Sequence, residues 1–128
     1  MSRQVDPGVR LCALRGAISV GSDDADAIVA ATQELLEALF AKNGVEPEDL
    51  VSVLFTATPD LTAQFPAAAA RKLGIQDVPL LCAREIDVPD ALPRCIRVLI
   101  HLYSARARGD LRHVYLGDAR QLRSDLPQ

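Results

Sequence analysis

The residues best suited to chemistry in this chain are an arginine and a glutamate in separate apolar stretches. Arg97 lies within the run 95–100, whose β-branched and aliphatic residues have the pattern of a buried strand. A buried guanidinium is costly unless a carboxylate and hydrogen bonds compensate it. Glu85 ends a second apolar stretch, 78–85, and is the residue that would pair with it. An arginine held in this way would bind an anionic or oxygen-rich ligand through its fork of donors.

A second interpretation of Arg97 needs no ligand. A long arginine stem can lie along apolar surface at the end or edge of a strand, with its charged head in water. However, polar residues recur in or beside the other apolar strands, and together they form the candidate set Arg15, Cys82, Glu85, Arg97 and Tyr115. This set would hold an anion by charge-assisted hydrogen bonds and stabilise charge as it develops in a reaction.

Other chemistries have weaker support. The sequence contains no phosphate loop, no Gly-rich dinucleotide fingerprint and no Gly-x-Ser-x-Gly elbow. His101 and His113 lack metal-ligand spacing, so each is expected to be structural and no metal site is predicted. Cys82 with Glu85 and a histidine would suit a thiol hydrolase, but no pattern places either histidine beside Cys82, and a cysteine in a buried strand is usually inert.

Composition indicates one ordinary globular domain over residues 1–128. The chain is 49% hydrophobic and 24% charged, and its length allows a real core. A net charge of −3 and only 4% aromatic residues argue against a nucleic-acid partner. The three cysteines, Cys12, Cys82 and Cys95, are an odd number within apolar runs, which favours reduced thiols in the cytoplasm. There is no apolar run long enough to span a membrane and no signal peptide, so no membrane partner is expected.

The elements that must position the candidate set alternate at first and then pair. Apolar patterns predict strands over 9–20, 50–58, 78–86, 95–103 and 111–116, with helices over about 22–43 and 63–73. This order, β-α-β-α-β-β-β, predicts an α+β fold in which a mixed sheet carries both helices on one face. Two helices leave the other face uncovered, so an oligomer is expected. Residues 1–8 and about 118–128 are expected to be flexible.

Several short sequences, in order and with similar spacing, resemble the AroH class of small monofunctional chorismate mutases. They are LRGAI at 14–18, TATPDL at 56–61, FPA at 65–67, VPLLCARE at 78–85, CIRV at 95–98, RHVYL at 112–116 and LRSDL at 122–126. The resemblance implies that three subunits form a pseudo-α/β-barrel with active sites in the clefts between them. It also implies conversion of chorismate to prephenate, on the route to phenylalanine and tyrosine, without a cofactor or metal. The alternative is a non-catalytic trimeric small-molecule binding protein of the same fold.

The resemblance also implies roles for individual residues. Arg97 would hydrogen-bond the ether oxygen of the breaking bond, and Glu85 would hold the ring hydroxyl. Arg15 and Tyr115 would bind the substrate carboxylate. The other residues expected to bind substrate are the segment Leu81, Cys82, Ala83 and Arg84, the apolar wall Phe65 and Ala67, and the solvent-side groups Arg71 and Arg123. Ala68 departs from the pattern, because some members of the class carry a charged residue there.

Overall fold

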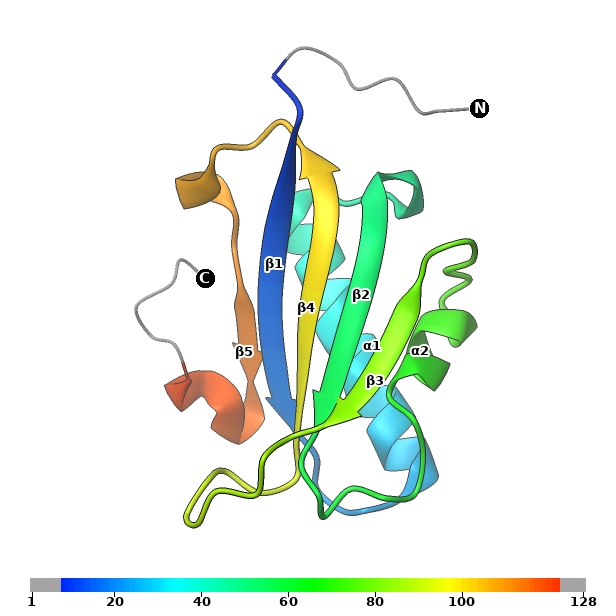
Figure 1. Ribbon diagram of the computed structural model, residues 1–128, viewed down its shortest axis with the longest axis vertical. Helices are drawn as coiled ribbons and strands as arrows, with labels where there is room; N and C mark the ends of the chain where they lie inside the picture. The colour runs from blue at the N-terminus through cyan, green and yellow to red at the C-terminus, as the bar shows by residue number, and fades with distance from the viewer. Residues whose placement is uncertain (1–7, 123–128) are drawn as a thin grey trace.

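A five-stranded mixed sheet is the frame of the molecule (Figure 1), described here from a computed structural model for residues 8–122. The strand order is β3-β2-β4-β1-β5. The strands are β1 (Arg10–Ser19), β2 (Leu50–Ala57), β3 (Leu80–Arg84), β4 (Cys95–Ser104) and β5 (Val114–Leu116). The two α-helices are α1 (Ala25–Asn43) and α2 (Ala67–Lys72), and three short 3₁₀ helices are η1 (Pro47–Asp49), η2 (Arg108–Asp110) and η3 (Gly117–Gln121).

The strand that comes fourth in the chain lies at the centre of the sheet. β4 pairs antiparallel with β1 on one side and with β2 on the other. The two edge strands are parallel to their neighbours, β3 to β2 and β5 to β1. Both helices lie on the same side of the sheet in Figure 1, and α1 contacts β1 while α2 contacts β3. The predicted α+β fold, with both helices on one face of a mixed sheet, is therefore confirmed.

Helix α1 has clear start and stop signals. Asp24 is its N-cap and accepts a hydrogen bond from the Ala27 amide at 3.0 Å. Gly44 ends the helix in the left-handed conformation, with φ of 61°, and its N–H bonds to the Phe40 carbonyl. The helix packs against β1 at Gly16, where the backbone approaches closely because there is no Cβ.

Alternation along the strands separates two faces. The face under the helices holds the apolar core, which includes the fully buried Leu14, Phe55 and Ile100. The opposite face, called here the helix-free face, includes Arg15, Leu54, Thr56, Arg97 and Leu99, which the strand register places side by side. It carries exposed apolar side chains, among them Leu99 at 38% exposure.

Some predicted boundaries were wrong. α2 begins at Ala67 rather than at residue 63, because the Thr62 and Ala63 amides bond to the Asp23 carboxylate and Pro66 has no N–H to donate. β5 spans three residues rather than six, because η2 ends at Asp110 and residues 111–113 that follow it are not in a strand. Residues 117–121 form η3, in which Ala119 is fully buried, and the flexibility expected from about residue 118 stays a prediction; the expectation for residues 1–7 and 123–128 lies outside the described residues. Within residues 8–122, no helix has both the length and the apolar character needed to cross a membrane.

Candidate active site

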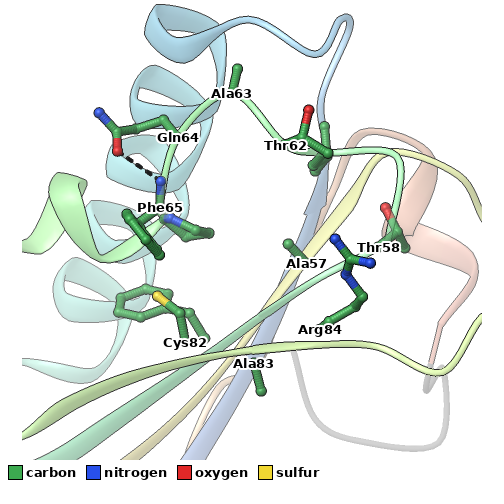
Figure 2. A pocket seen from close by; sticks show the side chains of 12 residues that line it. Ala57, Thr58, Thr62, Ala63, Gln64, Phe65, Cys82, Ala83 and Arg84 are labelled. Carbon is green, nitrogen blue, oxygen red and sulfur yellow. Dashed lines mark hydrogen bonds between the residues drawn. The ribbon is translucent and has the colours of Figure 1, made fainter.

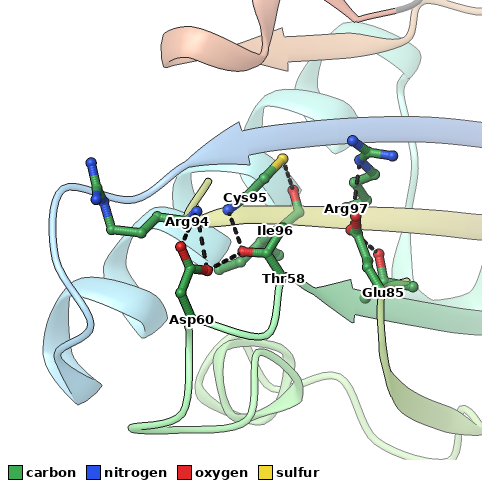
Figure 3. A network of polar contacts seen from close by, with 8 residues as sticks. Thr58, Asp60, Glu85, Arg94, Cys95, Ile96 and Arg97 are labelled. Atoms are coloured by element: carbon green, nitrogen blue, oxygen red, sulfur yellow. Dashed lines mark hydrogen bonds and ion pairs between the residues drawn. The ribbon is translucent and has the colours of Figure 1, made fainter. Parts of the chain in front are cut away.

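Arg97 and Glu85 meet on the helix-free face. Arg97 Nε lies 3.6 Å from Glu85 Oε2, and their side chains are 30% and 14% exposed. Thr56 pairs with Arg97 across β2 and β4, and its Oγ1 donates a 2.6 Å hydrogen bond to the same carboxylate oxygen. The predicted pairing of Arg97 with Glu85 is confirmed. The alternative, in which the Arg97 guanidinium lies in water without a partner, is wrong. Arg97 Nε is buried, and its interaction with the described residues is this ion pair with Glu85 rather than a hydrogen bond (Figure 3).

An open cleft of about 790 Å³ surrounds this pair. Arg15, Arg84 and Arg97 line it with Glu85 as the single acidic residue, and apolar side chains such as Leu99 complete the wall. Arg15 and Arg97 lie on the helix-free face with Glu85, so among the described residues two guanidinium groups stand against one carboxylate, which leaves a net positive charge in the cleft. The cleft therefore suits a small anion with an apolar body.

A second, smaller pocket of about 350 Å³ lies beside α2 (Figure 2). The loop before α2 supplies one wall, with Phe65 69% exposed, and β3 supplies the other with Cys82, Ala83 and Arg84. Phe65 and Cys82 lie near each other across this pocket. Arg84 lines both the pocket and the cleft, so the end of β3 separates the two.

Two further predicted residues, Leu81 and Tyr115, lie on the helix-free side. Leu81 is 59% exposed and pairs with Leu54 of β2 on the helix-free face. Tyr115 is 3% exposed and packs in a small cluster with Ala17 of β1. Ala17 pairs with Tyr115 on one side and with Arg97 on the other, so β1 lies between Tyr115 and Arg97.

The helical residues are placed differently again. Ala67 is 6% exposed and packs in the core, so in one chain it lines neither cavity. Arg71 is an exposed residue in the last turn of α2. Arg123 lies outside the described residues.

A polar network that the sequence interpretation missed joins the loop after β2 to the start of β4 (Figure 3). Thr58 Oγ1 donates to Asp60 at 2.5 Å and accepts from the Cys95 amide at 3.0 Å, and the Asp60 carboxylate accepts from the Arg94 amide. Arg94 has a φ of 46°, a conformation that such backbone bonds help to hold. The turn sequence Thr58-Pro59-Asp60 was the available signal for this network.

The thiols show no sign of nucleophilic activation. Cys95 is fully buried, and burial raises the pKa of its thiol. Cys82 and the Arg97–Glu85 pair lie on opposite sides of the sheet, and neither histidine lines the pocket of Cys82. Within residues 8–122, no group of three His, Cys, Asp or Glu side chains has the arrangement of a metal site.

Together, the fold and the cleft define a small α+β protein with an arginine-lined anion site on an open sheet face. The sequence profile of the type I chorismate mutases matches residues 11–126. Chorismate mutase AroH of Thermus thermophilus is 50% identical over 114 residues, covering 88% of this chain and 93% of that protein. Chorismate mutase AroH of Bacillus subtilis is 44% identical over 114 residues, covering 88% and 90%.

A solved structure agrees with these sequence comparisons. The chorismate mutase from Clostridium thermocellum superposes with a TM-score of 0.86 at 48% identity, covering 87% of this chain and 99% of that one. The chain belongs to the type I chorismate mutase family. Its activity is accordingly that of an isomerase that acts on chorismate.

Proposed function

We propose that chorismate rearranges to prephenate against the Arg97–Glu85 pair. The observation that carries this assignment is the 3.6 Å approach of a partly buried guanidinium to a carboxylate, inside a cleft that two further arginines line. In the proposal, Arg97 hydrogen-bonds the ether oxygen of the breaking bond and Glu85 holds the ring hydroxyl. Arg15 and Tyr115 bind the substrate carboxylates.

The reaction is intramolecular, and its atoms balance within the substrate. One carbon–oxygen bond breaks while one carbon–carbon bond forms, so no proton moves and no group is transferred to the protein. The flexible enolpyruvyl arm must first be folded over the ring, which is an orientation problem that carboxylate-binding arginines solve. Negative charge then grows on the ether oxygen and positive charge on the ring. A fixed cation at Arg97 and a fixed anion at Glu85 oppose those changes and so bind the transition state more tightly than the substrate.

The proposed site is shared between subunits of a homotrimer. Arg15, Leu81, Glu85, Arg97 and Tyr115 belong to the helix-free side, whereas Phe65 and Cys82 line the pocket on the helical side. The sheet backbone lies between these two groups within one chain. If the helical-side pocket of one subunit abuts the helix-free face of the next, the two groups contact the same substrate. The exposed apolar residues of the helix-free face support such packing.

Three further residues have roles in the assembled site. Ala67 is proposed to form the apolar wall together with Phe65. Arg71 and Arg123 are proposed to act from the solvent side. The three free cysteines support a reducing compartment, and the cytoplasm is the proposed location.

Chorismate turnover by the purified protein tests this assignment. Chorismate absorbance should fall to completion with substoichiometric protein, and nuclear magnetic resonance should identify prephenate as the product. Arg97→Ala should fold with the wild-type circular dichroism spectrum and lack turnover. A protein that binds one chorismate per site without consuming it would instead be the non-catalytic binding protein, and the proposed roles of Arg97 and Glu85 would be withdrawn.

A further inference from the structure

Two carboxylates hold the loop that borders the smaller pocket through hydrogen bonds. Residues 58–66 connect β2 to α2 and supply Thr62, Ala63 and Phe65 to the pocket wall. A loop of this kind is usually mobile unless its backbone amides have partners. The two carboxylates, Asp60 and Asp23, supply those partners.

The first carboxylate, that of Asp60, holds the start of the loop beside the central strand β4. Asp60 accepts the Arg94 amide at 3.0 Å and the Thr58 hydroxyl, next to the first residues of β4 (Figure 3). This part of the loop is therefore fixed to the same strand that carries Arg97.

The second carboxylate, that of Asp23, comes from a turn that is distant in the sequence. Asp23 precedes α1, and its Oδ1 accepts from the amides of Thr62 at 2.8 Å and Ala63 at 3.0 Å. Its Oδ2 accepts from the Thr62 hydroxyl at 2.7 Å. These bonds lower the pKa of Asp23 below its ordinary value of 3.8, chiefly through the Thr62 hydroxyl. The carboxylate is thus charged and bonded at neutral pH, and these contacts weaken only as the pH falls through that lowered pKa.

The anchor itself is rigid, although Asp23 is exposed. Asp24 caps α1, and α1 is held by buried side chains that include Ile28, Leu35 and Leu36. The bonds from Asp23 therefore fix the loop backbone to an element that cannot move independently of the core. Phe65 follows only two residues after Ala63.

We propose that Asp23 is a positioning residue for substrate binding, holding the Thr62–Ala63 backbone so that Phe65 is preset as a wall of the site. This inference rests on the proposed function, since it requires that Phe65 contacts chorismate. Without these bonds the loop must be ordered when substrate binds, and that cost lowers affinity. Arg97 lies on β4 and Glu85 directly follows β3, and neither bonds to Asp23 or to the Thr62–Ala63 backbone, so the chemical step keeps its geometry.

The experiment compares Asp23→Ala with Asp24→Ala in the assembled enzyme. Both variants remove a carboxylate from the same turn, but Asp24 caps α1 whereas Asp23 bonds the loop. For Asp23→Ala we expect KM to rise about three- to tenfold, the scale of one net hydrogen bond or slightly more, with kcat within about twofold of wild type. Hydrogen exchange at the Thr62 and Ala63 amides should accelerate in this variant only. Asp23→Asn, which keeps an acceptor oxygen, should recover part of the KM effect, and it provides the test if Asp23→Ala does not fold.

Two outcomes overturn the inference. One is an unchanged KM in Asp23→Ala although the Thr62 and Ala63 amides exchange faster, because the bonds would then hold the loop without serving substrate binding. The other is an equal rise in KM in Asp24→Ala, because a general loss of stability would explain both. Phe65→Ala separates this failure from that of the proposed site. If Phe65→Ala leaves KM unchanged, the assignment of Phe65 is wrong; if it raises KM while Asp23→Ala does not, only the role of Asp23 is wrong.

Discussion

Arg97 and Glu85 meet although β4, which carries Arg97, and β3, which Glu85 directly follows, are not neighbours in the sheet. β2 lies between β3 and β4, and the two side chains approach to 3.6 Å next to Thr56 of that intervening strand. The Glu85 amide also bonds to the carbonyl of Ala57, which fixes the residue just beyond the end of β3. The relative position of cation and anion is therefore set by three adjacent strands, and this preorganisation is what electrostatic catalysis requires.

Arg97→Lys should lose at least about a hundredfold in kcat, the scale for removing one preorganised donor. The charge is retained, but a point-charge ammonium cannot reproduce the planar fork of donors. Chorismate turnover measures the loss, and Arg108→Lys, at an exposed position in η2, is the matched control. Turnover by Arg97→Lys near the wild-type value would count against the assigned role.

Cys82→Ser should keep substantial activity, because the rearrangement needs no nucleophile and a serine hydroxyl can make the same hydrogen bond as the thiol. For the same reason, wild-type kcat should vary little between about pH 6 and 8, since no general acid or base is required. Steady-state turnover tests both expectations, with Cys12→Ser as the control. A dead but correctly assembled Cys82→Ser, together with a covalent adduct on Cys82 by mass spectrometry, would support the thiol hydrolase instead.

Leu99→Glu should dissociate the proposed trimer. Leu99 is 38% exposed in a single chain and lies between Leu54 and Arg15 on the helix-free face, so a carboxylate there costs a lone chain little but is costly in a subunit interface. Light scattering should give the trimer mass for wild type and a lower mass for Leu99→Glu, which should also be inactive. Ala30→Glu places the same charge on the exposed side of α1 and should remain trimeric. An active wild-type monomer would exclude a shared site.

Gly16→Ala should lower the free energy of unfolding by about 1–3 kcal/mol, the usual cost of overpacking. A Cβ at Gly16 would lie 3.0 Å from Cδ1 of both Leu35 and Leu39 and 3.1 Å from the Val114 carbonyl oxygen. A denaturant titration measures the change. Gly109→Ala is the control, since a Cβ there meets nothing within 4 Å and should leave stability nearly unchanged.

The strongest local patterns in the sequence predicted their structures well. The apolar spacing of α1, with Asn43 and Gly44 at its end, predicted that helix to within a few residues. Arg97 within a β-branched strand predicted a compensated charge, and Glu85 is its partner. These features depend on neighbours in the chain or on a charge that must be compensated wherever it is buried.

Features that depend on long-range packing were not predictable in the same way. Which side of the sheet Cys82 faces depends on the register of β3 against β2, and the sequence of β3 does not indicate it because Leu81, Cys82 and Ala83 are all apolar and do not alternate with polar residues. The start of α2 depends on Asp23, which is 39 residues before Thr62 in the sequence. The burial of Tyr115 depends on packing against Ala17 and Ala119.

The central position of β4 also governs when the chain can fold during synthesis. β1 and β2 do not pair with each other, and each obtains its antiparallel partner only when Cys95–Ser104 is available. The contact between Arg10 and Ser104 spans almost the whole described chain, so loop closure is costly and folding is expected to be slow for a domain of this size. A nascent chain that ends before Cys95 can form α1 and the β2–β3 pair but not the sheet. It would expose the apolar residues of β1 and the unpaired edge of β2 until residues 95–104 have left the ribosome.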